Sequence, residues 1–94
     1  MPNCYHVTTS TPEKAGKSIK ECVRDVGGPG KLVKLQTDGR KTYSEVEYET
    51  LELAYQYLGP LTDCMRSKGH EVHDARVLAN FEEIGLAGPD QSAD

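Results

Sequence analysis

The sequence predicts an α+β domain whose elements follow the order β-α-β-β-α-β. Two stretches place apolar residues at helical spacing, and each lies between stretches in which β-forming residues alternate. The pair Asp38-Gly39, the strongest hairpin signal in the chain, joins the two middle strands. We therefore expect a ferredoxin-like sandwich, in which two helices cover one face of a four-stranded antiparallel sheet. With 94 residues the chain has the length of a single domain, expected at residues 1–87, followed by a flexible acidic tail at 88–94.

The first β-α unit is expected to occupy residues 3–26. Residues 3–9 are rich in β-forming side chains and predict a strand. A helix should follow over residues 12–26, with Ser10 or Thr11 as its N-terminal cap. The glycine-rich segment 27–30 then ends this helix.

The middle of the chain predicts a hairpin of strands 31–37 and 41–48. An alternative stays open for the second of these strands. Ser44 and Glu47 have the spacing of a capping box, so a helix could begin there instead. We prefer the strand, because Asp38-Gly39 requires a partner for residues 31–37.

The last β-α unit is expected from residue 50 onward. Apolar residues recur at helical spacing to about residue 68, but Gly59-Pro60 should kink this helix or split it in two. Residues 71–79 then predict the final strand.

In a sheet with this connectivity the first and third strands are central. Side chains alternate between the two faces of a strand, so one set from these strands should lie on the face without helices. The predicted set is Cys4, His6, Thr8, Tyr43, Glu45 and Glu47.

The composition restricts the class of partner. The net charge is −4 and the isoelectric point about 5.3, which argues against direct binding to nucleic acid, since such binding needs clustered basic residues. No apolar run approaches the length of a membrane span, and the N-terminus has no signal-peptide pattern. A partner, if there is one, is expected to be a protein.

The three cysteines are Cys4, Cys22 and Cys64. An odd number at wide and irregular spacing is a poor disulfide framework. Reduced thiols are therefore expected, and with them a cytoplasmic protein.

Acidic residues are concentrated around the third strand. Glu45, Glu47 and Glu49 alternate along it, with Tyr43 next to them. A row of like charges costs stability unless a cation or a basic partner offsets it. These four residues are the predicted binding surface for a protein with a basic surface, and a merely solvated face is the alternative.

Cysteine and histidine residues suggest a second kind of site. Cys4, His6, His70 and His73, with Cys64 nearby, include ligand types that zinc accepts. Their spacings match no common zinc motif, so no cofactor is expected, and a metal site stays an alternative.

Two family resemblances rest on short features. Tyr5-His6-x-Thr8 resembles the opening strand of some ADP-ribosyltransferases, where a histidine contacts the nicotinamide cofactor. The later motifs of that family are missing, so its activity is not carried over. The element order is similar to that of RNA-recognition motifs, but Glu45 and Glu47 occupy a strand that is basic and aromatic there.

The sequence as a whole favours a small acidic protein-binding or regulatory module rather than an enzyme. In size and charge it is similar to phage-type inhibitors of host machinery, such as anti-CRISPR proteins. A homodimer is also compatible with the sequence. The alternative function is a small-ligand or metal-sensing domain.

Overall fold

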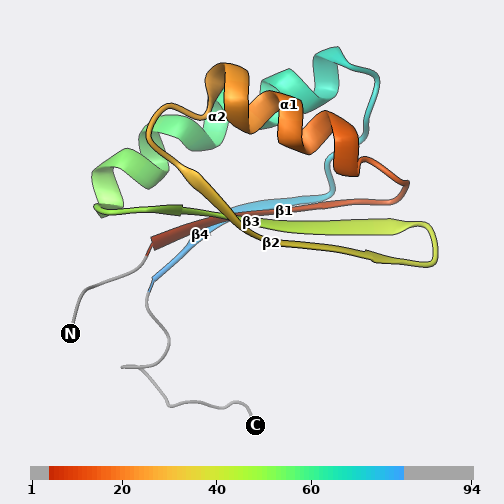
Figure 1. Ribbon diagram of the computed structural model, residues 1–94, viewed down its shortest axis with the longest axis horizontal. Helices are drawn as coiled ribbons and strands as arrows, with labels where there is room; N and C mark the ends of the chain where they lie inside the picture. Colours follow the sequence, from red (N-terminus) through yellow and green to blue (C-terminus); the bar gives the residue numbers. More distant parts are fainter. Residues whose placement is uncertain (1–4, 80–94) are drawn as a thin grey trace, which may run out of the picture.

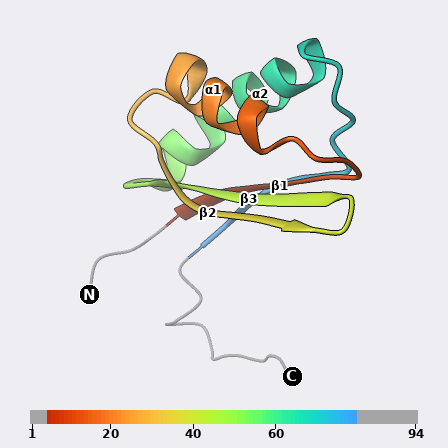
Figure 2. The ribbon, with the colours of Figure 1, turned by 45° about the vertical axis from the view of Figure 1, so that its right-hand side comes forward.

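A computed structural model describes residues 5–79 and confirms the α+β class (Figure 1). Its elements are β1 (Tyr5–Thr11), α1 (Gly16–Val26), β2 (Lys31–Asp38), β3 (Lys41–Tyr48), α2 (Leu51–Ser67) and β4 (Asp74–Leu78). The four strands form one antiparallel sheet in the order β2-β3-β1-β4. Figures 1 and 2 show both helices on the same face of this sheet. The predicted boundary between residues 1–87 and a tail at 88–94 lies outside the described residues.

The central strands β1 and β3 pair in a register that sorts their side chains between the two faces. Val7 lies opposite Val46, and both are buried beneath the helices. Their neighbours along the strands point away from the helices, because side chains alternate along a strand. The helix-free face of the two central strands therefore carries polar residues.

The first helix begins four residues later than predicted. Thr11 still pairs with Thr42 in the sheet, so it belongs to β1 and is not a helix cap. The Thr42 hydroxyl donates to the carbonyl of Glu13 at 2.7 Å and accepts from the N–H of Ala15 at 3.0 Å. This buried threonine ties down the turn between β1 and α1, and the helix starts only after it.

The hairpin of β2 and β3 is confirmed, and residues 41–48 form a strand rather than the start of a helix. Gly39 has a φ of 62°, the left-handed conformation that a tight two-residue loop requires. An irregularity between Leu32 and Lys34 leaves Val33 exposed on the outer strand. Such a bulge makes the edge of a sheet a poorer template for unwanted pairing.

The second helix is continuous through Pro60, so of the two predicted outcomes, a kink or a split, the split into two helices is wrong. The steric conflict before a proline involves the Cβ of the preceding residue, and Gly59 has none. The Thr50 hydroxyl caps the helix by accepting from the N–H of Leu53 at 3.1 Å. Neither helix within residues 5–79 combines the length and apolar character that crossing a membrane requires.

The final strand is shorter than predicted. It covers Asp74–Leu78 rather than residues 71–79, and among the described strands it pairs with β1 alone. The N–H of His73 donates to the carbonyl of Ser10 at 2.8 Å, just before the ladder begins.

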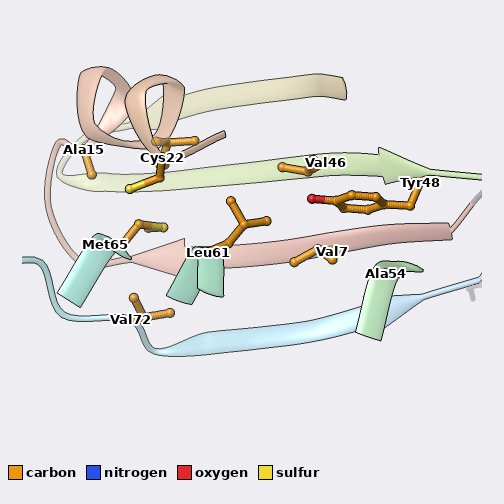
Figure 3. Close-up of a cluster of buried hydrophobic side chains, with 10 residues drawn as sticks. Val7, Ala15, Cys22, Val46, Tyr48, Ala54, Leu61, Met65 and Val72 are labelled. Atoms are coloured by element: carbon orange, nitrogen blue, oxygen red, sulfur yellow. The ribbon is translucent and has the colours of Figure 1, made fainter. Parts of the chain in front are cut away.

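The hydrophobic core lies between the sheet and the helices (Figure 3). Its buried members are Val7, Ala15, Ile19, Cys22, Val46, Tyr48, Ala54, Leu61, Met65 and Val72.

Tyr48 joins this core to the loop between α1 and β2. Its hydroxyl donates to the carbonyl of Gly27 at 2.7 Å, and its ring stacks on Tyr57 with centroids 5.3 Å apart. A Cβ at Gly30 would lie 2.5 Å from the Tyr48 ring, so this position admits only glycine.

A disulfide bond joins Cys22 on α1 to Cys64 on α2, with Cα atoms 5.9 Å apart. The prediction of reduced thiols is therefore wrong for these two residues. Helical spacing turned both cysteines toward the other helix, and tertiary packing paired residues that are 42 positions apart. The cytoplasmic prediction loses the argument from free thiols on which it rested.

Candidate functional site

The face of the sheet without helices, called the open face from here on, carries mostly polar and charged side chains. Strand register places the following residues on it: Lys31, Lys34, Gln36, Asp38, Lys41, Tyr43, Glu45, Glu47, His6, Thr8, Ser10, Asp74, Arg76 and Leu78. The open-face residues that were predicted for the two central strands and that the structure describes are all in this set, namely His6, Thr8, Tyr43, Glu45 and Glu47.

Four of these side chains form a continuous polar chain across β3 and β1. The Tyr43 hydroxyl donates to Glu45 Oε2 at 2.7 Å. The other oxygen of this carboxylate, Oε1, lies 2.9 Å from His6 Nδ1. The opposite ring nitrogen, Nε2, lies 3.6 Å from Glu47 Oε2. One histidine thus connects the two glutamates on the strand beside it.

The polar chain is only partly accessible to solvent. The exposed fractions of its charged side chains are 17% for Glu45, 21% for His6 and 34% for Glu47. Burial is the largest cause, and the hydrogen bond to Glu45 the second, of a pKa of the Tyr43 phenol well above its ordinary value. Tyr43 therefore keeps its proton and remains a hydrogen-bond donor throughout the physiological range.

Basic residues on the outer strand lie beside the glutamates. By register Lys31 is opposite Glu47, and Lys34 is opposite Glu45. The Lys34 ammonium also lies 5.6 Å from the centre of the Tyr43 ring, a cation–π distance. These lysines offset part of the repulsion that a row of glutamates would otherwise cause.

The structure brings together three of the four residues predicted to bind a partner. Tyr43, Glu45 and Glu47 share the open face. Glu49 follows the end of β3 and is exposed in the turn before α2, outside this group.

The histidines predicted as alternative metal ligands lie in different surroundings. His6 belongs to the polar chain, and Cys4 is outside the described residues. His73 is exposed, with Nε2 3.6 Å from the Glu71 carboxylate. Within residues 5–79, no group of three or more histidine, cysteine or acidic side chains has a geometry that could hold a metal ion.

His70 forms a second polar group, which sequence reasoning missed. Its Nδ1 lies 2.6 Å from Glu13 Oε2, and its Nε2 lies 2.8 Å from Ser18 Oγ. The three residues come from the turn before α1, from α1 itself and from the loop after α2. No local spacing connects them, so the sequence alone carries no signal for this group.

No protein-family model matches the sequence, and no curated protein matches it either.

Proposed function

We propose that this protein is a protein-binding and regulatory module whose open face docks onto a partner with a basic surface. The strand order β2-β3-β1-β4, with both helices on one side, supports a ferredoxin-like arrangement that leaves one sheet face free for such docking. The observation that carries the proposal is the polar chain of Tyr43, Glu45, His6 and Glu47 at the centre of that face.

The polar chain holds the Glu45 carboxylate in place before any partner arrives. Glu45 is held through both carboxylate oxygens, one by Tyr43 and one by His6. A side chain that is already ordered loses little conformational entropy on binding. A lysine or arginine of the partner would therefore meet a fixed acceptor rather than a mobile glutamate.

The charges around the polar chain support a defined docking orientation. The glutamates of β3 form a central acidic band, Lys31 and Lys34 lie on the strand at one side, and Arg76 lies toward the other edge. Complementary charge patterns contribute specificity and register more than raw affinity. By occupying a basic surface, such a module blocks other ligands of its partner, which is a regulatory effect in itself.

The test compares two double variants that lose the same charge at different places. Glu45→Gln with Glu47→Gln neutralises the acidic band, whereas Glu52→Gln with Glu71→Gln neutralises two exposed residues outside the open face. Affinity capture from a lysate of the source cells, quantified by mass spectrometry, should identify a partner with a basic surface. We expect the first variant to capture at least about tenfold less of the partner than the unmodified protein, and the second variant to capture as much as the unmodified protein.

Equal capture by both double variants would contradict the proposal. So would a monomer that captures no protein yet gains thermal stability with a metal ion or a metabolite, since that result favours ligand sensing. Light scattering on the eluted protein distinguishes a partner from a second copy of this chain. A dimer that the Glu45 and Glu47 substitutions dissociate would assign the open face to self-association instead.

A further inference from the structure

The side chains of Ser18, His70 and Glu13 are aligned as a hydrogen-bonded relay in the helical layer, away from the open face. The distances are 2.8 Å from Ser18 Oγ to His70 Nε2 and 2.6 Å from His70 Nδ1 to Glu13 Oε2. His70 is largely buried, with 15% of its side chain exposed, and Ser18 is half-buried. The two hydrogen bonds therefore fix the orientation of the imidazole, while the Ser18 residue is partly exposed to solvent.

The chemistry of Glu13 and Ser18 determines which ring nitrogen of His70 donates a hydrogen bond and which one accepts. An ionised carboxylate only accepts hydrogen bonds, so His70 Nδ1–H must donate to Glu13. In a neutral imidazole the other nitrogen, Nε2, then carries the lone pair and accepts from the Ser18 hydroxyl. This is the tautomer that a general base needs in order to take a proton from a serine nucleophile.

The position of Ser18 adds a second element to the arrangement. It is the third residue of α1, a helix whose N-cap residue, Ala15, offers no side-chain cap. The first N–H groups of a helix have no acceptor within the helix and lie at its positive end. Such groups beside a nucleophile can stabilise the oxyanion that forms when it attacks a carbonyl.

We propose that Ser18 is a nucleophile for small carboxylic esters, with His70 as its general base and Glu13 as a positioning residue. The Ser18 oxygen forms a bond to the ester carbonyl carbon while its proton passes to His70 Nε2. The bond to the leaving alcohol breaks, and that alcohol takes the proton from His70. Water then attacks the acyl-serine, loses its proton to His70 and releases the carboxylic acid, and Ser18 recovers its proton.

The test uses a fluorophosphonate, which reacts with activated serines, and p-nitrophenyl acetate as an ester. Peptide mapping of the full-length protein should find the phosphonate on Ser18, and the ester should leave an acetyl group there. Ser67 is the matched control serine, because its exposed hydroxyl donates to the carbonyl of Cys64 and is hydrogen-bonded to no histidine among residues 5–79. We expect Ser18 to react at least about a hundredfold faster than Ser67, the usual range for general-base assistance.

Substitutions at His70 and Glu13 separate chemistry from structure. His70→Asn should lower labelling of Ser18 by about a hundredfold or more, and free imidazole should restore part of the rate to His70→Ala. Glu13→Gln should lower the rate at an unchanged melting temperature, and Glu13→Asp should retain most of it. Labelling of Ser18 no faster than of Ser67 would overturn the proposal. So would an unchanged rate in a folded His70→Asn variant, which would leave the three residues a purely structural contact.

Discussion

Glu45 on β3 lies 2.9 Å from His6 on β1, and this pair joins the two central strands on the side of the sheet that has no helix. The two residues are 39 positions apart in the sequence, and they are diagonal rather than direct neighbours, since His6 is paired with Glu47. The histidine thus reaches both glutamates. The hydrogen bonds from Tyr43 and His6 therefore fix the geometry of the Glu45 carboxylate.

Loss of the disulfide between the helices should lower stability strongly. Cys22 and Cys64 are separated by 42 positions, and closing a loop of that length in the unfolded chain corresponds to about 4 kcal/mol in the chain-entropy model. The Cys22→Ala/Cys64→Ala variant should therefore show a lower free energy of unfolding in urea. Cys4→Ala controls for removal of a cysteine outside the bridge. A midpoint that responds neither to the double substitution nor to a dithiol reductant would contradict the pairing.

Stability should also fall in alkaline solution. Burial, with a smaller effect from Tyr57, raises the pKa of Tyr48 from 10.0 to about 12. The folded state therefore holds this proton more tightly than the unfolded state does. The resulting contribution to the free energy of unfolding is complete below pH 10 and is lost as the pH rises to about 12.

Urea unfolding at about pH 9 and about pH 11 measures this loss. Tyr48→Phe should weaken the dependence on pH, at a cost of about 1 kcal/mol at lower pH for the missing hydrogen bond to Gly27. Tyr55→Phe is the control: it removes one phenol, as Tyr48→Phe does, but from an exposed position of α2. Equal pH dependence in the two variants would refute the assignment to Tyr48.

Replacing the proline within α2 should stabilise the protein. Pro60 lies well inside Leu51–Ser67 and has no N–H to donate to the preceding turn. Proline in a helix interior costs roughly 3 kcal/mol relative to alanine, so Pro60→Ala should raise the free energy of unfolding by up to about that amount. Gln56→Ala, one turn earlier and exposed, is the control and should change little. A lower midpoint for Pro60→Ala would mean that the helix depends on the proline at this position.

Local patterns predicted the strands and the hairpin because their signals lie within a few residues. The turn at Gly39 and the alternation along Lys41–Tyr48 are of this kind. The start of α1 was wrong because Thr42, from a distant strand, controls the preceding turn. The disulfide and the relay around His70 were missed for the same reason, since packing of the two helices brings their members together.

The open-face residues were accessible to sequence reasoning because period-two alternation assigns a face to every residue of a strand. Tyr43, Glu45 and His6 could be placed on one surface once the strand order was assumed. The hydrogen bonds between these side chains could not be predicted, because they depend on the register in which β1 and β3 pair. A shift of one residue would have moved the glutamates into the core.

Docking of a partner on the open face can be tested within a single sample by aromatic carbon–proton NMR signals. The rings of His6 and Tyr43 report from the open face, whereas Tyr55 on α2 and the exposed His73 report from elsewhere. When the captured partner is added, we expect shifts or broadening of the His6 and Tyr43 signals, with the Tyr55 and His73 signals unchanged. Changes at Tyr55 with unaltered His6 and Tyr43 signals would contradict docking on the open face.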